Sequence, residues 1–425
     1  MHRILGPFFI PFLRLEYYLS AWLELIGYWL TGKGWYTRLR ALSGSWPVKP
    51  YPIRRLAIFA AFHGTEVPLS NISYLKCLRE AGFEILYLHN GKVSSTAIET
   101  LKPLCISVIE RPNLGQDWGS YKDGFLNLRR AGWLENLEWL LFCNDSVHFL
   151  GDEYGSAFAH RLNDHLCTID EPILALNENL QLWQHLQSFF VAVKPEVFNS
   201  EKFISFWQDY LPLSHRYHAI NKGEVRWSLR VLNEYRKKVL YSPSALYDYA
   251  SKEFENEHWL GVSRLLIPKS CGSIVDGLRS HLAEDINSDE DRKKQPRSGG
   301  RFTTNYMYWD QMMALMGILE STNTSHSCAL MYCALLGSPF LKKDICRHNT
   351  YTLSQIKQFL EFHFLYGNQK NCENHLLLYN EILSSFLSQG TLVSYLFRPR
   401  ISFRKGLMYR GFGISQESLP NYGNR

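Results

Sequence analysis

The stretch Trp139-Leu140-Leu141-Phe142-Cys143-Asn144-Asp145-Ser146 decides how the rest of the chain is interpreted. Its five apolar residues are too few for a typical helix and suit a strand that is buried on both faces of a parallel sheet. Ligands of open α/β sheets bind beyond the carboxyl ends of the strands, where Asp145 can reach a divalent cation or a ribose hydroxyl. Asn144, Asp145 and Ser146 are also ordinary turn residues, so this segment alone favours a turn and a ligand site equally.

Strand and helix patterns alternate on both sides of this stretch. Such alternation is typical of an α/β fold whose mostly parallel sheet carries helices on both faces through right-handed crossovers. Apolar spacing, with Gly82 as a helix stop, sets the element limits. The expected strands are 56–62, 83–88, 105–109, 139–143, 173–176, 189–193 and 239–241, and the expected helices among them are 70–81, 96–102, 117–131, 200–211 and 224–235.

The 425 residues divide into four parts by composition. Residues 1–50 form an apolar, aromatic and helical segment, and residues 51–276 hold the alternation of strands and helices. Residues 277–301 are polar and charged, which indicates a linker or surface loop. Residues 302–425 show apolar helical patterns at 306–319, 329–336 and 354–364 and carry a basic and aromatic tail at 392–412.

The first part and the tail both suit a membrane surface. Tyr17 to Leu30 is strongly apolar but contains Glu24, so its uncharged length falls short of the roughly 20 residues that span a bilayer. A helix in the membrane interface is one interpretation, and a helix packed on the globular body is the other. The tail fits a membrane contact or a solvated basic segment equally well. We expect a peripheral membrane contact and no signal peptide.

Composition narrows the class of partner. Hydrophobic residues make up 46% of the chain and charged residues 20%, which is typical of a globular protein. A formal net charge of +6 permits nucleotide phosphates or acidic lipids as partners but is no signature of nucleic-acid binding. The nine cysteines include no Cys-x-x-Cys pair, which argues against zinc and disulfide frameworks and favours a reducing cytosol.

The segment after the third expected strand carries a second group of polar residues. Arg111, Asn113 and Asp117 supply a cation, an amide and a carboxylate within one loop, and the glycines at 115 and 119 allow close backbone approach to a ligand. The loop leads into a helix whose N-terminus favours anions. The alternative is a tight loop in which Asp117 caps the helix.

Further candidates lie at other strand ends. His63 and Asn90 end the first two expected strands, where a nucleotide would lie. His185 and Gln187 precede the strand at 189–193 and are candidates for the acceptor side, although a histidine in this setting is often structural. The cluster Lys342, Lys343 and Arg347 could bind diphosphate or a lipid-linked acceptor, and a solvated face is the default interpretation.

Four blocks in this order resemble a known family. They are Arg111-Pro-Asn-x-Gly-x-Asp-x-Gly-Ser-Tyr-Lys122, Leu141-Phe-Cys-Asn-Asp-Ser-Val147, His185-Leu-Gln-Ser-Phe-Phe190, and Gly337-Ser-Pro-Phe-Leu-Lys342 with Arg347 and Asn349 beyond it. Together they look like the signature blocks of the rhamnan synthesis F family, which are glycosyltransferase-like proteins of bacterial cell-surface polysaccharide assembly. The resemblance covers residues 56–349 and implies a GT-A-like nucleotide-sugar fold.

The resemblance also implies roles for two carboxylates. In inverting GT-A transferases the end of the fourth strand carries an Asp-x-Asp that binds the metal and the sugar diphosphate, and the matching positions here are Asn144, Asp145 and Ser146. Only one carboxylate remains. Mg²⁺ or Mn²⁺ can still bind if the diphosphate supplies other oxygens, because magnesium needs few protein ligands.

The second carboxylate is Glu224. Gly223-Glu-Val-Arg-Trp-Ser-Leu-Arg230 resembles the late helix whose first residues hold the catalytic base of this group, again with one acidic residue where the pattern has two. We expect the helix to begin near Glu224, because Lys222 and Gly223 break the preceding pattern. The helix dipole would then favour the ionised carboxylate. A first-turn glutamate without a catalytic role would look the same.

These observations predict a transferase at the inner face of the bacterial plasma membrane. We expect transfer of a sugar, such as rhamnose or another deoxyhexose, from a nucleoside diphosphate to a lipid-linked or polysaccharide acceptor. Asp145 and Glu224 are the expected catalytic residues, and a single displacement with Glu224 as base would invert the anomeric centre. The rival interpretation is a non-catalytic glycan- or nucleotide-binding subunit of a polysaccharide assembly complex. It is favoured because the strand-end pattern and the late-helix pattern each keep only one of their two acidic residues.

Overall fold

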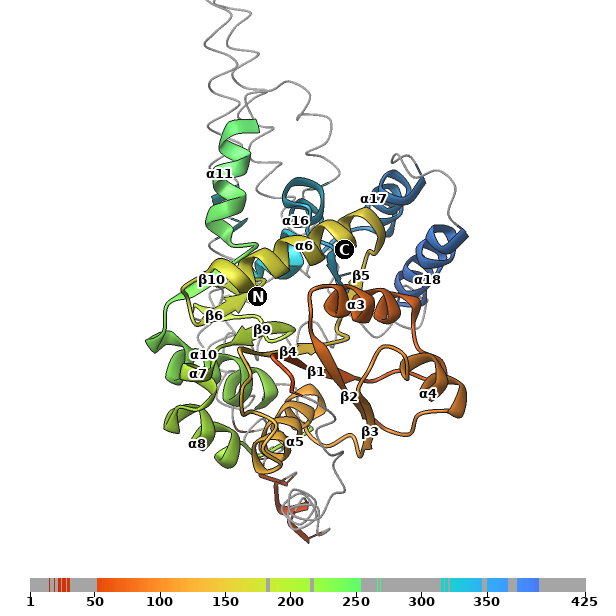
Figure 1. The fold of residues 1–425 in the computed structure, drawn as a ribbon. Helices are drawn as coiled ribbons and strands as arrows, with labels where there is room; N and C mark the ends of the chain where they lie inside the picture. The colour runs from red at the N-terminus through yellow and green to blue at the C-terminus, as the bar shows by residue number, and fades with distance from the viewer. Residues whose placement is uncertain are drawn as a thin grey trace, which may run out of the picture. The chain divides into compact units, whose positions relative to one another are not determined.

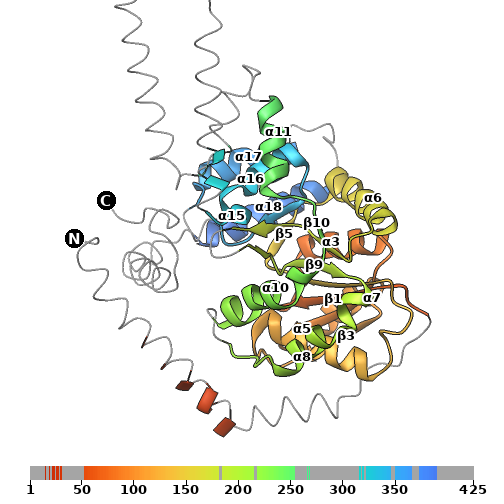
Figure 2. The same ribbon diagram turned by 90° about the vertical axis from the view of Figure 1, so that its left-hand side faces the viewer.

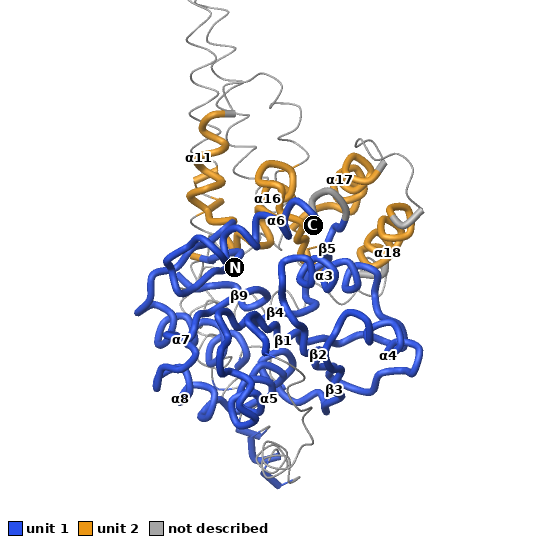
Figure 3. The backbone as a smooth tube through the Cα atoms, in the orientation of Figure 1, with its two compact units in different colours: residues 1–179, 183–240, 407–412 blue, residues 180–182, 241–406, 413–425 orange. Residues whose placement is uncertain are grey.

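The computed structural model describes residues 52–180, 184–214, 218–253, 322–345, 350–365 and 373–389, together with isolated residues between 15 and 30 and between 266 and 319 (Figure 1). The contacts divide the chain into two compact units (Figure 3). Unit 1 comprises Met1–Asn179, Trp183–Leu240 and Leu407–Phe412, and unit 2 comprises Leu180–Leu182, Tyr241–Gly406 and Gly413–Arg425. The predicted linker at 277–301 and the tail at 392–412 lie outside the described residues.

Unit 1 is built on a seven-stranded sheet in the order β10-β6-β9-β4-β1-β2-β3. Its strands are β1 (Arg55–Ala61), β2 (Glu84–Asn90), β3 (Ser107–Arg111), β4 (Trp139–Asn144), β6 (Ile173–Ala175), β9 (Phe190–Val193) and β10 (Lys237–Val239). Neighbouring strands run parallel except at β9, which is antiparallel to both β4 and β6. The predicted mixed α/β class with a mostly parallel sheet is therefore confirmed. Short strands β5 (Val147–Phe149), β7 (Glu178–Asn179) and β8 (His185–Leu186) were not predicted.

Helices cover both faces of this sheet (Figures 1 and 2). One face carries α3 (Leu69–Glu80) and α6 (Asp152–Thr168), and the other carries α5 (Gln116–Arg130) and α8 (Glu201–Asp209). The sequence analysis did not predict α6. The remaining helices of unit 1 are α4 (Ser95–Leu101), α7 (Pro195–Phe198), the π-helix η1 (Ala219–Val225), α10 (Arg226–Arg230) and the 3₁₀-helix η2 (Leu232–Glu234).

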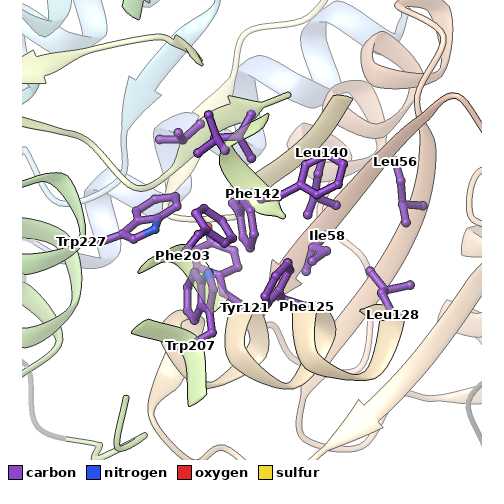
Figure 4. Close-up of a cluster of buried hydrophobic side chains, with 14 of the residues drawn as sticks. Leu56, Ile58, Tyr121, Phe125, Leu128, Leu140, Phe142, Phe203, Trp207 and Trp227 are labelled. Atoms are coloured by element: carbon purple, nitrogen blue, oxygen red, sulfur yellow. The ribbon is translucent and has the colours of Figure 1, made fainter. Parts of the chain in front are cut away.

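An aromatic core joins the sheet to the α5 face (Figure 4). Phe142 of β4 stacks on Trp207 of α8 at 5.4 Å between ring centroids, and Phe125 of α5 packs edge-on against Phe203 at 5.1 Å. All four side chains are fully buried. Burying one such ring stabilises the fold by about 1.5–3 kcal/mol, so this core fixes α5 and α8 firmly on β4. The helices α5 and η1 that carry candidate site residues therefore rest on a rigid base.

The helix predicted at 224–235 begins earlier than expected. The π-helix η1 starts at Ala219 and ends at Val225, and α10 follows directly. Gly223 does not break the helix, because its missing side chain lets η1 pack on Trp118: a Cβ there would lie 2.7 Å from Trp118 Cδ2. The prediction that Glu224 lies in a first helical turn is therefore wrong.

Unit 2 is described in part. Its elements are α11 (Pro243–Glu253), α15 (Thr324–Ser327), α16 (Ala329–Leu336), β11 (Phe340–Lys342), α17 (Leu353–Leu365) and α18 (Glu373–Gln389). Helix α16 covers the predicted span 329–336 and ends at Gly337, whose φ of 63° is the left-handed conformation that glycine adopts readily. The Tyr351 hydroxyl donates to the Ser327 carbonyl at 2.6 Å. Of the predicted basic cluster, Lys342 and Lys343 are described and Arg347 is not.

The N-terminal segment is described only at isolated residues between 15 and 30, and these are helical. Its apolar side chains are exposed: Leu19 is 53% exposed, Trp22 61%, Leu23 67% and Leu30 83%. No described helix is both long and apolar enough to cross a membrane.

Candidate functional site

The candidate residues gather where the parallel strands β4, β1 and β2 end. Asp145 directly follows β4, and its backbone N–H donates to the Ala60 carbonyl of β1 at 3.1 Å. Its Oδ2 atom accepts the backbone N–H of Phe62, also at 3.1 Å, and the residue is 8% exposed. The Oδ1 atom has no hydrogen-bond partner among the described residues. The Asp145 carboxylate is thus held in place through its Oδ2 atom.

Asn144 links this strand end to the loop that follows β3. Its Nδ2 donates to Asp117 Oδ2 at 2.9 Å, and its Oδ1 accepts the backbone N–H of Ser146 at 3.0 Å. The N-cap of α5 is Gly115, with a φ of 74°, and Asp117 lies in the first turn. Asp117 therefore does not cap the helix, which was the alternative interpretation. The bond from Asn144 brings two predicted site residues into contact.

Arg111 and Asn90 form a buried network under the same loop. The Arg111 guanidinium donates to Asn90 Oδ1, to Asp123 Oδ2 at 3.0 Å and to the Leu114 carbonyl at 2.9 Å. Ser120 Oγ donates to Asn90 Oδ1 at 3.0 Å. Arg111 is 3% exposed and Asn90 1%. Both residues therefore support the loop from inside, although they were predicted to contact the donor.

The remaining donor-side candidates, His63 and Asn113, lie just beyond the carboxyl ends of β1 and β3. His63 is partly exposed, its Nε2 is 2.8 Å from the Tyr87 hydroxyl, and its backbone N–H donates to His89 Nε2 at 3.2 Å. Asn113 is exposed, and its carbonyl accepts a hydrogen bond from Ser214 Oγ at 3.3 Å. Their side chains face solvent at least in part, so a ligand can reach them.

A second cluster surrounds Glu224. Glu224 Oε1 lies 3.2 Å from Gln187 Nε2 and 3.3 Å from His185 Nε2. Glu224 Oε2 accepts the backbone N–H of Ser188 at 3.0 Å and the Ser188 hydroxyl at 2.6 Å. The His185 side chain is 2% exposed and that of Glu224 is 16% exposed. The strand end at β8 thus supplies four polar contacts to one carboxylate.

These contacts determine the charge of Glu224. Burial raises the pKa of a carboxyl group because it penalises the charged form. Here the hydrogen bond and charge of His185 and the two hydrogen bonds from Ser188 outweigh burial and lower the pKa of Glu224 to about 2. The carboxylate is therefore ionised at neutral pH. The cause is the surrounding side chains and not the first-turn helix dipole that we predicted.

Helix α5 connects the two clusters. The Tyr121 hydroxyl donates to the Ser188 carbonyl at 2.9 Å, and the Trp118 ring lies against Gly223. Asp117, one residue before Trp118, accepts the bond from Asn144. Tyr121 and Ser188 were not predicted as site residues, even though both stand inside the blocks that carry the family resemblance. Their contribution is a hydroxyl and a backbone group, which sequence spacing does not reveal.

A metal ion at the end of β4 would have few protein ligands among the described residues. The described residues contain no group of three or more histidine, cysteine, aspartate or glutamate side chains that could hold an ion. Asp145 offers one carboxylate oxygen without a partner among the described residues. This donor set fits Mg²⁺, which commonly binds one or two carboxylates and completes its shell with water and phosphate oxygens.

Two comparisons relate the sequence of this chain to known proteins. The model of the rhamnan synthesis protein F family matches residues 85–267, which confirms the resemblance over that part of the chain. The matched part includes Asp117, Asn144, Asp145 and the cluster around Glu224, but not Phe62 or His63. A protein of Sinorhizobium fredii (strain NBRC 101917 / NGR234), named "Uncharacterized protein y4gN", is 25% identical over 152 residues. That alignment covers 36% of this chain and 39% of the relative, so the chain spans well under half of that protein.

Proposed function

We propose that the chain is a glycosyltransferase of polysaccharide synthesis. It transfers a sugar, such as rhamnose or another deoxyhexose, from a nucleoside diphosphate to a growing cell-surface glycan. The family match over residues 85–267 associates the chain with rhamnan synthesis. The observation that carries the proposal is the ionised Glu224 carboxylate, which α5 connects to the strand end that bears Asp145. The mostly parallel sheet of unit 1 suits a GT-A-like nucleotide-sugar fold.

In the proposed reaction the acceptor hydroxyl attacks the anomeric carbon of the donor. Glu224 accepts the hydroxyl proton as the new carbon–oxygen bond forms, and the bond to the diphosphate breaks on the opposite face. One such displacement inverts the anomeric centre, by the same logic as in inverting glycosidases. Asp145 would hold Mg²⁺ or Mn²⁺, which supplies positive charge to the leaving diphosphate. Asn144 and Ser146 flank Asp145 at the strand end and would lie beside the diphosphate, and His63 and Asn113 would line the donor side.

The proposed location is the cytoplasmic side of the plasma membrane. The exposed side chains of Leu19, Trp22, Leu23 and Leu30 support a helix that lies in the interface with its apolar side in lipid. Tryptophan suits this depth, because its ring is apolar and its N–H stays near the headgroups. Peripheral attachment would keep the enzyme close to a lipid-linked acceptor.

A non-catalytic binding subunit is the second candidate. The observation that favours it is the single carboxylate at each of the two positions where GT-A transferases carry more. Such a protein would bind the nucleotide-sugar or the glycan without turnover. Donor binding alone therefore does not distinguish the two functions.

Donor binding is tested by thermal shift with nucleoside diphosphates and their sugars, each with and without Mg²⁺ or Mn²⁺. A ligand at one hundred times its Kd stabilises the folded state by about 2.7 kcal/mol, which raises Tm by several degrees. We expect a metal-dependent rise for the wild type that is lost in Asp145→Ala and kept in Asp170→Ala, an exposed acidic residue of the same unit. Equal shifts in wild type and Asp145→Ala would show that Asp145 holds no donor.

A further inference from the structure

His185 lies beside the Glu224 carboxylate and is almost fully buried. Its Nε2 lies 3.3 Å from Glu224 Oε1, and its side chain is 2% exposed. Asn179 of β7 pairs with His185 in the backbone ladder, and the Leu186 N–H donates to Ser228 Oγ of α10 at 3.0 Å. The imidazole is thus held between β7 and the η1–α10 segment. The groups that its Nε2 contacts include Glu224 and the Gln187 amide, whose Nε2 lies 3.3 Å away.

The contacts of Glu224 indicate what His185 contributes to the carboxylate. A carboxylate offers about four acceptor positions. Ser188 occupies Oε2 with its backbone N–H and its hydroxyl, while Oε1 faces Gln187 and His185. Removing His185 would leave Oε1 with the Gln187 amide at 3.2 Å, so a largely buried carboxylate would lose one of its four polar contacts and its neutral form would become more favourable. The neutral form cannot accept a proton from an acceptor hydroxyl.

We propose that His185 is a positioning residue that keeps Glu224 ionised and oriented as the general base. This inference rests on the proposed function, and it replaces the expectation that His185 contacts the acceptor. His185 acts through Glu224 and touches no reacting atom. Ser188 fixes the opposite oxygen, so the two residues hold the carboxylate from both sides.

Other charged groups nearby do not take over this role. The other titratable side chains on β7, η1, α10 and the first turns of α5 include Lys222, Arg226, Arg230, Glu178, Asp117 and Tyr121. Lys222, Arg226 and Arg230 are exposed, so solvent and salt screen their charges. Glu178 accepts a hydrogen bond from Gln184 at 2.9 Å, and the charge of Asp117 or Glu178 would disfavour a second carboxylate.

The test compares His185→Leu with His185→Gln. Leucine removes the donor, whereas the glutamine amide can still donate a hydrogen bond but cannot carry a charge. In His185→Leu we expect turnover at pH 7 to fall about tenfold or more, because the carboxylate is no longer held in position, and the acidic limb of the rate profile to move to higher pH, because the ionised form is less stabilised. His185→Gln should move the limb less than His185→Leu does, because it keeps the hydrogen bond and loses only the charge, and it should keep most of the turnover. Ser228→Ala, which removes the bond to Leu186 on the same strand, should leave the limb in place.

Two outcomes would overturn the proposal. A raised KM for the acceptor in both His185 variants, with the acidic limb unmoved, would make His185 an acceptor contact. Equal losses in the two His185 variants and in Ser228→Ala, again without movement of the limb, would make it a packing residue only.

A second measurement separates this inference from the proposed function. Unfolding by guanidinium is followed between pH 7 and pH 3 in the same variants. The midpoint of the wild type and of His185→Gln should fall on acidification more than that of His185→Leu, which has lost the bond that holds Glu224 ionised. That result with no transfer by any variant would keep the pairing and reject the transferase. Parallel pH dependence in all three proteins would reject the pairing itself.

Discussion

Glu224 shows how neighbours decide the protonation state of one residue. Burial alone would favour the neutral carboxyl group, yet His185 and Ser188 lower its pKa to about 2. The distances of 2.6 Å and 3.0 Å to Ser188 are those of hydrogen bonds to a charged acceptor. A pKa this low guarantees an ionised base but weakens its proton affinity. In the proposed reaction, an acceptor hydroxyl that binds at Oε2 would take the place of a donor such as the Ser188 hydroxyl before proton transfer.

The low pKa predicts a pH-dependent contribution of Glu224 to stability. Because the folded-state pKa of about 2 lies below the ordinary value of 4.5, the contribution is complete above about pH 4.5 and is lost as the pH falls toward 2. Each pKa unit corresponds to about 1.4 kcal/mol, so Glu224→Gln should lower the free energy of unfolding at pH 7 by up to about 3 kcal/mol. Denaturant titrations at pH 7 and pH 3 should show the gap narrowing. A gap that is constant with pH, or one shared by Glu178→Gln, would contradict this origin.

Among the elements, the loop from Arg111 to α5 depends on Gly119, where no larger residue fits. A Cβ on Gly119 would lie 1.8 Å from the Leu114 carbonyl oxygen and 2.7 Å from Arg111 Nη2. The backbone of the loop therefore turns back on the first turn of α5, and the buried guanidinium fills the remaining space. This packing places Asp117 beside Asn144 and Trp118 beneath η1.

We predict that Gly119→Ala destabilises the protein by about 3 kcal/mol or more, because the clash is with backbone and cannot be relieved by a rotamer change. In an ordinary helix the same substitution would stabilise by about 1 kcal/mol, so the sign is informative. Gly64→Ala is the matched control, since nothing lies within 4 Å of a Cβ there, and its effect should stay within about 0.5 kcal/mol. Denaturant midpoints measure both. A neutral or stabilising Gly119→Ala would mean that the loop has another conformation.

Sequence patterns predicted the elements that are apolar and regular, and failed where packing decides. The strand from Trp139 and helix α16 were predicted nearly to the residue, because their apolar runs are continuous and bounded by turn residues. Helix α6 was missed. The π-helix η1 was also missed, since Gly223 breaks helices on average and is tolerated here only because Trp118 lies against it. A sequence contains no sign of that contact between distant residues.

The same limit applies to the candidate site. Asp145 and Glu224 could be named from a strand end and a family resemblance. Their partners could not, because Phe62 contributes a backbone N–H and Ser188 a hydroxyl and an N–H. Arg111 was expected at the ligand for its charge, whereas the structure buries it against Asn90 and Asp123. The charge of a residue alone does not distinguish a ligand contact from a buried side chain that supports a loop.

At the scale of the whole molecule, the exposed apolar side chains near the N-terminus predict attachment to a membrane. Deleting residues 1–46 should move the protein from the membrane fraction to the soluble fraction, because stable peripheral binding usually needs more than one weak contact. In the full-length chain, Leu23→Glu should weaken binding to vesicles that contain acidic lipid, while Leu25→Glu, at a half-buried position, should affect folding more than binding. Full solubility of the wild type in lysate would refute this attachment.

The central claim is that this protein transfers a sugar with Glu224 as the base. The most direct measurement is release of nucleoside diphosphate from a panel of nucleotide-sugars by purified wild type and Glu224→Gln, with a membrane extract as the source of acceptor. The amide keeps the size of the side chain but cannot take the proton. We predict turnover by the wild type and a loss of about a hundredfold or more in Glu224→Gln, with the donor-induced thermal shift unchanged. Donor binding without turnover by the wild type, or equal turnover by both proteins, would contradict the account.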